Sequence, residues 1–300
     1  MTSYSPEVSS LSVLMSVYNG RPYLNKAIES ILKQTYCDFE FIIIDDASTD
    51  GSRGLLKQWA DQDERIRLIF HDENRGLGYS LNEGVRKSRG KWVARMDADD
   101  ISFLDRFERQ VKYLNAHPDV DILSGCAIDF DEDGNPLRLR QVPPSHEDII
   151  QLLWTIPIIH PAVIFRRDAI LEAGSYSPDL RRRQDYDLWF RCAAEGLRFA
   201  NLAEPLIFYR FTDDYYQKND LGTAIDQVKI GWRGCRLIGA GPIAYFGVLA
   251  PLIRALLPRS MSKLMQRLLH KFDPRSKQDE IPEAIRRKYL SGGDIPQMMS

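Results

Sequence analysis

Short apolar runs alternate with amphipathic segments along the first half of the chain. Each run ends at polar or turn-forming residues and predicts a buried strand, whereas the segments between the runs repeat apolar residues at helical spacing. This alternation predicts an α/β fold in which a mostly parallel, Rossmann-like sheet carries helices on both faces. The predicted strands are Leu11–Val17, Phe39–Ile44, Ile66–Phe70 and Trp92–Met96, and the predicted helices begin at Pro22, contain Leu55–Trp59, and cover Gly76–Lys87 and Phe103–Leu114.

Polar side chains follow three of these predicted strands. Asn19 follows the first strand, Asp45 and Asp46 follow the second, and the cluster Asp97–Asp100 follows the fourth. Parallel strands bring their carboxyl ends to one edge of a sheet, where the ligands of such folds bind. The sequence therefore predicts one pocket that gathers all of these groups.

The acidic cluster indicates a particular chemistry. Its carboxylates, Asp97, Asp99 and Asp100, repel one another, so a bound cation or a functional role is expected to offset the repulsion. Oxygen ligands suit Mg²⁺ or Mn²⁺, ions that commonly bridge to substrate phosphates. The alternative is an exposed acidic turn that caps the helix after Asp100.

Composition and absent motifs narrow the function classes. A formal net charge of −2 over 300 residues gives no reason to expect a nucleic-acid partner. The cysteines are scattered and the polar first residues lack a signal-peptide pattern, so a cytoplasmic protein with reduced thiols is expected. The chain contains neither Gly-x-Gly-x-x-Gly nor a P-loop motif, which argues against a dinucleotide-binding dehydrogenase and a P-loop protein.

Motifs in a fixed order carry a family resemblance. They are Ser12–Asn19, Ile44–Ser52, Asn74–Leu77 and Ala94–Asp100. Together they resemble the motifs of the inverting family-2 glycosyltransferases with the GT-A fold, and the resemblance extends over about Leu11 to Arg210. It implies a nucleoside-diphosphate sugar donor, usually UDP-linked, and a divalent metal cofactor, Mn²⁺ or Mg²⁺.

The resemblance also implies roles for individual residues in a nucleotide-sugar site. The alternatives are structural: a strand end for the serine, turn or cap positions for the aspartates after the second strand, and a solvated loop charge for the arginine. By position, Ser16 and Asp46 resemble the nucleobase-binding residues, Arg75 a further donor contact, Asp97 the ribose ligand and Asp99 the metal ligand, while Asp45 and Asp100 are supporting carboxylates.

The second half of the chain must supply the acceptor site and a catalytic base. In the family, the segment that matches Gln184–Trp189 usually reads Glu-Asp-Tyr-Asp-Leu-Trp, with the second acid as the base. Here Gln184 replaces the glutamate and Asp185 is retained. The resemblance therefore makes Asp185 the base that takes the proton of the acceptor hydroxyl. The alternative is that Asp185 is the N-cap of the following helix.

Other polar residues of this half are candidates for substrate contacts. His160, Arg183 and Gln184 are predicted to contact the acceptor or the leaving diphosphate. A lone histidine is commonly structural, and the run Arg181–Arg183 is equally typical of a solvated surface. After Tyr209-Arg210 the family often has a histidine, but this chain continues with an aromatic residue and a threonine.

The C-terminal part has a different character. Pro242–Leu257 is apolar, but it is proline-interrupted and shorter than the ~20 residues of a spanning helix. Basic residues then alternate with leucines up to Phe272, and the combination predicts an amphipathic segment on an anionic membrane surface. The alternative is packing on the catalytic domain or in a dimer, and the oligomeric state stays open.

The expected organisation and function follow from these patterns. We expect a catalytic domain over 1–220, with a nucleotide-sugar-binding half at 11–117 and an acceptor-binding half at 118–220, a helical segment at 221–275 and a polar tail at 276–300. The expected activity is inverting, metal-dependent transfer from a UDP-sugar to a hydroxyl of a glycan or lipid-linked acceptor, at the cytoplasmic membrane face. One alternative is a sugar-phosphate nucleotidyltransferase, although its usual glycine-rich phosphate loop is missing near Ser16–Gly20. The other is a catalytically silent nucleotide-sugar-binding scaffold, which Gln184 keeps open.

Overall fold

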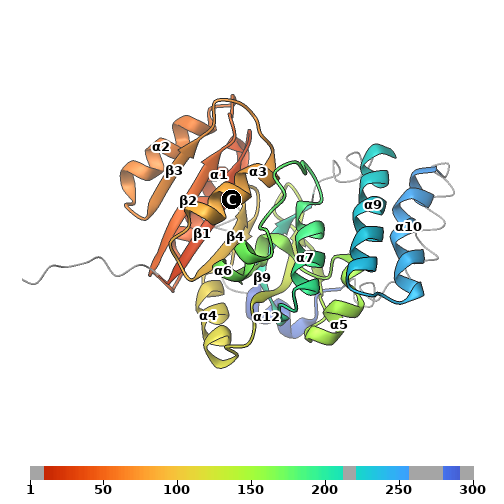
Figure 1. The fold of residues 1–300 in the computed structure, drawn as a ribbon. Coiled ribbons are helices and arrows are strands. Elements are labelled where there is room, and N and C mark those ends of the chain that lie inside the picture. Colours follow the sequence, from red (N-terminus) through yellow and green to blue (C-terminus); the bar gives the residue numbers. More distant parts are fainter. Residues whose placement is uncertain (1–9, 212–220, 257–279, 291–300) are drawn as a thin grey trace, which may run out of the picture.

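A mixed β-sheet organises the molecule. The computed structural model describes residues 10–211, 221–256 and 280–290. Its strands lie in the order β3-β2-β1-β4-β8-β6-β9-β5, with β7 paired to β6 (Figure 1). As predicted, β1 to β4 are parallel, whereas β8 lies antiparallel to both of its neighbours. The strands are β1 Leu11–Val17, β2 Phe39–Asp45, β3 Ile66–Phe70, β4 Trp92–Asp97, β5 Ile101–Ser102, β6 Ile122–Phe130, β7 Pro136–Arg140, β8 Ile164–Arg166 and β9 Phe199–Arg210.

Helices cover both faces of the sheet, which confirms the predicted α/β class (Figure 1). Side chains of a strand alternate between its faces. Leu11, Val13 and Met15 of β1 therefore share one core with α1, α2 and α4, whereas Leu14 shares another with α3 and α7. The helices are α1 Arg21–Leu32, α2 Ser52–Gln62, α3 Leu77–Lys87, α4 Arg106–Ala116, α5 His146–Gln151, α6 Arg167–Glu172, α7 Gln184–Ala194, α9 Leu221–Leu237, α10 Pro242–Leu256 and α12 Glu283–Tyr289, with short 3₁₀ turns η1 Leu153–Thr155 and η2 His160–Ala162.

One predicted helix begins later than expected. The helix expected from Phe103 begins at Arg106, because the residues just before Phe103 form β5 and pair with β9. The ring of Phe103 packs on that of Phe208, at a centroid distance of 4.4 Å. Residue spacing cannot reveal such a pairing between strands far apart in sequence. The capping alternative for the acidic cluster is also wrong, since the N-cap of this helix is Asp105.

Buried polar contacts join the two halves of the catalytic region. The backbone N–H of Arg95 on β4 donates to the carbonyl oxygen of Val163, at 2.9 Å. The guanidinium of Arg106 is fully buried and donates to the carbonyl oxygen of Arg95, at 2.8 Å. The side-chain amide of Gln110 donates to the carbonyl oxygen of Ala162, at 2.9 Å. The segment after η2 is thus held against β4 and α4 by polar groups that have no access to water.

The helices α9 and α10 form a hairpin that packs beside α7 (Figure 1). Two glycines permit the close approach: a Cβ atom at Gly234 would collide with the ring of Phe190, and one at Gly247 would collide with that of Trp154. The packing alternative for the apolar C-terminal stretch therefore holds for one face of α10. The basic stretch up to Phe272 lies outside the described residues.

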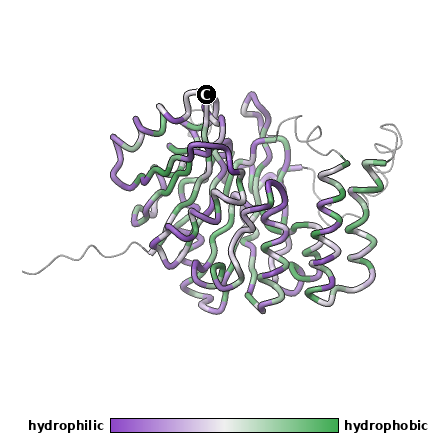
Figure 2. The backbone as a smooth tube through the Cα atoms, turned by 45° about the horizontal axis from the view of Figure 1, so that its top comes forward, coloured by the Kyte–Doolittle hydropathy of each residue, from purple (hydrophilic) through white to green (hydrophobic). Residues whose placement is uncertain are grey.

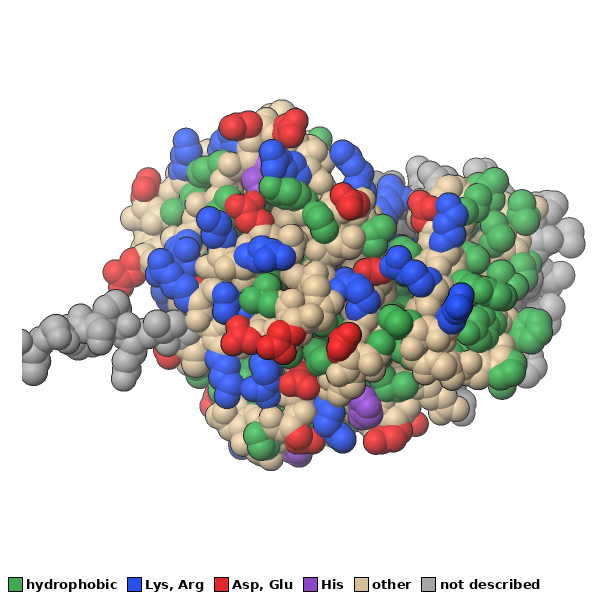
Figure 3. Space-filling model, in the orientation of Figure 1, with side chains coloured by type: hydrophobic (Ala, Val, Ile, Leu, Met, Phe, Trp, Pro, Cys, Tyr) green, Lys and Arg blue, Asp and Glu red, His purple; other side chains and the backbone are tan. Residues whose placement is uncertain are grey.

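The outer face of this hairpin is apolar and exposed. Hydrophobic side chains gather over α9 and α10 in Figure 3, and much of α10 is coloured hydrophobic in Figure 2. The side chains of Ile243 and Phe246 are 77% and 76% exposed, and Leu256 is 67% exposed. Within the described part of the chain, no helix is both long enough and apolar enough to cross a membrane.

Candidate active site

The loops that follow β1 and β2 are bound to each other. Asn19, which has a positive φ of 53°, accepts the backbone N–H of Thr49 on its side-chain oxygen, at 2.9 Å. The N–H of Asn19 donates to the hydroxyl of Ser48 at 3.0 Å, and that of Gly20 donates to the hydroxyl of Ser52 at 3.1 Å. These hydrogen bonds hold the two loops together at the carboxyl edge of the sheet.

The predicted donor residues lie along this edge of the sheet. Ser16 on β1 is the ladder neighbour of Asp97 on β4, and Val17 is the neighbour of Asp45 on β2. The parallel register therefore places Ser16 and Asp97 next to each other on one face of the sheet, whereas Asp45, in register with Val17, belongs to the opposite face. The three residues share the carboxyl edge of the sheet, as predicted, but the register does not direct all three side chains to one face.

Asp46 is buried and holds the loop after β3. One of its carboxylate oxygens accepts the N–H of Arg75 at 2.9 Å and contacts Nδ1 of His71 at 2.7 Å. The other accepts the N–H of Gly76 at 2.8 Å. Nε2 of His71 in turn lies 2.9 Å from a carboxylate oxygen of Glu83 on α3. The nucleobase role of Asp46 stays a prediction, and the geometry adds a structural one.

Asp45 is also buried, and an arginine partly neutralises it. The Nε–H group of Arg53 and the backbone N–H of Ser48 donate to one carboxylate oxygen, at 3.0 and 3.3 Å. The other oxygen has no hydrogen-bond partner in the described part of the chain. Sequence reasoning missed Arg53, His71 and Glu83, because their pairing depends on how α2, β3 and α3 pack.

Arg75 lies on the surface of the donor loop. Its guanidinium stacks on the ring of Tyr79, 4.6 Å from the centroid, and lies 3.6 Å from Glu73. A Cβ atom on the neighbouring Gly76, where φ is +89°, would lie 3.3 Å from the side chain of Arg181. The close approach at this glycine brings the arginine run Arg181–Arg183 against the predicted donor loop.

The acidic cluster is confirmed as a group of converging carboxylates. One oxygen from each of Asp97, Asp99 and Asp100 lies within 4.8 Å of the others. The guanidinium of Arg95 pairs with Asp97. Asp100 accepts the backbone N–H of Arg210 at 2.8 Å, and its other oxygen is buried without a partner among the described residues.

These carboxylates are poorly compensated by the protein. Desolvation and the neighbouring charge of Asp97 raise the pKa of Asp99 to about 6, although part of its side chain faces solvent. Burial and the charges of Asp99 and Asp97 raise the pKa of Asp100 well above its ordinary value. An all-oxygen donor set with an unpaired carboxylate oxygen fits a divalent cation such as Mg²⁺ or Mn²⁺. The triad can therefore hold a metal.

Arg95 connects the acidic cluster to the predicted base. It is 2% exposed, and its charge acts on the pKa values of Tyr176, His160 and Asp185. Both Asp97 and Asp185 also act on the pKa of Tyr176, so this buried hydroxyl is influenced by the acidic cluster and by the predicted base alike. The sequence contained a signal for this role: Arg95 is the charged residue within the otherwise apolar run of β4.

Asp185 lies in the first turn of α7. The helix begins at Gln184 and its N-cap is Arg183, which has a positive φ of 60°, so the alternative that Asp185 is the N-cap is wrong. Burial raises the pKa of Asp185, and the charge of Arg183 opposes that shift. The side chain of Gln184 is buried, and its oxygen has no hydrogen-bond partner in the described residues.

His160 has the contacts of a core residue. Its Nε2 lies 2.8 Å from the hydroxyl of Tyr176, and its ring meets Trp189 edge to face. Burial and the charge of Arg95 lower the pKa of His160 well below its ordinary value. A neutral, buried ring of this kind positions Tyr176, which matches the structural alternative.

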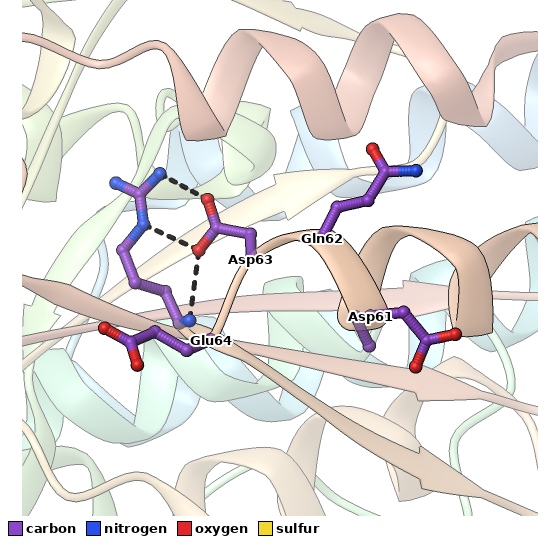
Figure 4. Close-up of a pocket in the computed structure, with 6 residues that line it drawn as sticks. Asp61, Gln62, Asp63 and Glu64 are labelled. Atoms are coloured by element: carbon purple, nitrogen blue, oxygen red, sulfur yellow. Dashed lines mark hydrogen bonds and ion pairs between the residues drawn. The ribbon is translucent and has the colours of Figure 1, made fainter.

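A surface hollow lies far from these residues. It is lined by Ala60–Arg65, between the end of α2 and the start of β3, whereas the predicted site lies at the carboxyl ends of the strands (Figure 4). Its main charged groups are paired, with Arg65 donating twice to Asp63 at 2.9 and 2.7 Å. None of the predicted site residues lines it.

Comparison with known proteins decides the family. The family model described as Glycosyl transferase family 2 matches residues 12–174, more than half of the chain. The chain belongs to glycosyl transferase family 2. This confirms the resemblance of the ordered motifs, and the protein is a glycosyltransferase.

Two relatives illustrate the similarity. The putative glycosyltransferase EpsE of Bacillus subtilis (strain 168) is 34% identical over 254 residues, which are 84% of this chain and 91% of the relative. The amylovoran biosynthesis glycosyltransferase AmsE of Erwinia amylovora is 37% identical over 212 residues, which are 69% of this chain and 78% of the relative. The family 2 glycosyltransferase is thus related to proteins of bacterial polysaccharide biosynthesis.

Solved structures share the fold. TarS 1–349 of S. aureus in complex with UDP-GlcNAc matches with a TM-score of 0.64 at 15% identity, over 97% of this chain and 82% of that chain. The mannosyltransferase PcManGT from Pyrobaculum calidifontis, in complex with GDP-Man and Mn²⁺, matches with a TM-score of 0.61 at 19% identity, over 94% and 88%. At these identities the likeness supports the GT-A-like fold.

Proposed function

We propose that this family 2 glycosyltransferase transfers a sugar, with inversion, from a UDP-sugar to a hydroxyl group of a glycan or lipid-linked acceptor. The observation that carries the proposal is the convergence of Asp97, Asp99 and Asp100 at the carboxyl end of β4, where the buried guanidinium of Arg95 pairs with Asp97. Relatives named for amylovoran and teichuronic acid biosynthesis support a polysaccharide acceptor. The TarS complex with UDP-GlcNAc supports a UDP-sugar, and the complex of PcManGT with GDP-Man makes GDP-sugars the second class to test.

Asp185 is the catalytic base in this proposal. The acceptor oxygen attacks the anomeric carbon while its proton passes to the carboxylate of Asp185, and the bond from that carbon to the diphosphate oxygen breaks. Burial raises the pKa of this carboxyl, so it holds the proton more readily than a solvated aspartate does. Gln184 places no second negative charge beside it, and Arg183 keeps the ionised form accessible.

The acidic cluster is the proposed metal centre. Asp99 is the proposed ligand, with Asp97 and Asp100 as neighbouring carboxylates that set the local charge. A bound Mg²⁺ or Mn²⁺ supplies neutralisation of the negative charge on the leaving diphosphate. Ser16 and Asp46 are the proposed nucleobase contacts, and Arg75 is a further donor contact.

A donor screen tests this function directly. The protein is heated with a panel of UDP- and GDP-sugars, with and without Mn²⁺. The true donor raises the unfolding temperature, because it binds the native state only. Release of free nucleotide from that donor then separates a transferase from a silent scaffold. No stabilisation by any nucleotide sugar in the presence of Mn²⁺ would contradict the proposal.

The base is tested by Asp185→Asn. We expect turnover to fall by roughly 10²–10⁴-fold with little change in donor affinity, because the amide cannot accept the proton. Gln184→Glu, which restores the usual family residue, is the matched variant and should retain activity. Wild-type turnover of the Asp185→Asn variant in a chemistry-limited assay would place the base elsewhere.

We further propose that the region from α10 to Phe272 contacts the cytoplasmic face of a membrane that carries the acceptor. The exposed apolar side chains of Ile243 and Phe246 support this contact, since such patches commonly mark interaction surfaces. The variant Ile243→Asp/Phe246→Asp should sediment less with anionic vesicles and should keep donor hydrolysis. Unchanged vesicle binding of this double variant would contradict the proposal.

A further inference from the structure

A cavity of about 210 Å³ lies beside the acidic cluster, on the α1 side of the sheet. Its lining combines charged and apolar side chains from α1, β5 and the ends of β6 and β9. Neither Asp185 nor any predicted donor residue lines it. The residues that matter for its chemistry are Tyr23, Lys26, Ile101, Phe130, Glu132 and Arg210.

Arg210 is held rigidly at the boundary between this cavity and the acidic cluster. Its guanidinium carbon lies 3.9 Å from the ring centroid of Tyr23 and 4.4 Å from that of Phe130. Its Nε–H group donates to the carbonyl oxygen of Asp99 at 2.9 Å, and its backbone N–H donates to the carboxylate of Asp100 at 2.8 Å. Two aromatic contacts and two hydrogen bonds therefore fix the orientation of the side chain.

The two terminal amino groups of Arg210 are available to bind a ligand. Among the described residues, they make no hydrogen bond, and Arg210 forms no ion pair within 4.0 Å. A planar guanidinium with both terminal groups available matches the two oxygens of a carboxylate or phosphate.

The surroundings indicate what carries this oxyanion. Lys26 adds a second positive charge on one side, while Glu132 supplies carboxylate oxygens that accept hydrogen bonds from hydroxyl groups. Tyr23 and Ile101 add apolar surface. The lining thus combines one fixed guanidinium, one carboxylate that can accept hydrogen bonds, and apolar walls. Such a combination suits a polar ring that carries a single acidic substituent.

We propose that this cavity is an acceptor subsite for a sugar residue that bears a carboxylate or phosphate group. Arg210 binds the oxyanion through its two terminal amino groups, and Glu132 accepts hydrogen bonds from ring hydroxyls. The assignment of this sugar as the acceptor rests on the proposed glycosyl transfer. The recognition of an acidic sugar by the cavity does not depend on that proposal. The neighbouring acidic cluster makes the donor diphosphate the competing source of the same oxyanion chemistry.

Ligand-observed NMR with simple probes tests the recognition. The probes are methyl β-glucuronide, glucose 6-phosphate and the neutral methyl β-glucoside, each added to the full chain. The two acidic probes should bind and the neutral one should bind more weakly. Arg210→Gln should weaken binding of the acidic probes by roughly tenfold or more, because a charge-assisted pair is lost. Equal binding of the glucuronide and the glucoside by the wild type would overturn the proposal.

A charge variant sharpens the test. Lys26→Gln should weaken binding of both acidic probes, because it removes a positive charge from the lining, and should leave binding of the neutral glucoside unchanged. This change does not touch the contacts of Arg210 with Asp99 and Asp100. Arg86→Gln, on the exposed side of α3, is the matched control and should leave binding unchanged. Unchanged binding of both acidic probes after Lys26→Gln would overturn the assignment.

Binding of UDP with Mn²⁺ separates the two sources of oxyanion. Arg210→Gln should retain wild-type UDP affinity in a folded protein, as judged by its thermal unfolding. If this variant loses UDP binding, the oxyanion is the donor diphosphate, and the acceptor subsite is wrong. If the wild type binds the acidic probes but neither binds nor turns over any nucleotide sugar, the subsite stands and the proposed transfer fails.

Discussion

Two pairs of adjacent aspartates lie at the carboxyl edge of the sheet, and the contacts that the protein makes with them differ. Asp45 and Asp46 follow β2, and Asp99 and Asp100 follow β4. Asp46 accepts two backbone N–H groups and contacts a histidine, and Asp45 pairs with Arg53. The first pair therefore uses most of its hydrogen-bonding capacity within the fold, although one buried oxygen of Asp45 has no partner among the described residues.

The second pair, Asp99 and Asp100, uses less of its hydrogen-bonding capacity within the fold. Asp100 accepts a single backbone N–H. Desolvation and the charge of Asp97 raise the pKa of Asp99, and desolvation and the charges of Asp99 and Asp97 raise that of Asp100. Buried carboxylates without enough donors are unstable unless a cation joins them. The contrast teaches that a ligand site is indicated by several converging carboxylates with raised pKa values, and not by a single oxygen that lacks a partner.

The largest effect that tests this contrast is expected at the second pair. Asp99→Asn should abolish Mn²⁺-dependent transfer, a loss on the order of 10²-fold or more, because a charged ligand becomes neutral. Nucleotide release at saturating Mn²⁺ measures it. Asp61→Asn, at the hollow on the far edge of the sheet, is the matched control and should be silent. Full wild-type activity in excess EDTA would show that the cluster is not a metal centre.

A smaller effect, on stability, is expected at the first pair. Asp46→Ala should lower the free energy of unfolding by about 1–3 kcal/mol, because the N–H groups of Arg75 and Gly76 lose their acceptor. Denaturant unfolding without nucleotide measures the loss. Asp99→Ala should not destabilise the metal-free protein in the same assay, and equal destabilisation by both variants would remove the contrast.

The smallest effect is a dependence on pH. The pKa of Asp99 in the fold, about 6, lies above its ordinary value of 3.8, so its contribution to the stability of the metal-free protein is full below about pH 4 and is lost as pH rises through 6. Metal binding needs the ionised form, so stabilisation by Mn²⁺ should grow over the same range. Unfolding temperatures with and without Mn²⁺, at about pH 5 and about pH 7.5, measure both trends. A Mn²⁺ effect that is the same at both pH values would contradict this assignment.

What the sequence revealed depended on distance along the chain. The strands β1 to β4 and the acidic cluster were predictable because short-range periodicity encodes a buried strand and its polar end. The start of α4 and the partners of Asp45 and Asp46 were not, because β9, Arg53 and His71 reach them only through tertiary packing. The cavity at Arg210 was hidden for the same reason, since its walls come from distant elements.

The buried polar contacts between β4, α4 and the segment after η2 limit how this chain can be recombined with its relatives. Arg95, Arg106 and Gln110 come from the first half of the sheet domain, and the backbone carbonyls of Ala162 and Val163, later in the chain, accept hydrogen bonds from them. In a chimera joined between these segments, the side chains of Arg106 and Gln110 must meet carbonyls whose positions are set by the other parent, with no water to bridge a displacement. The preferences for the sugar donor and for the acceptor substrate are therefore expected to be inherited together when relatives are recombined. They are not expected to be exchangeable independently of each other.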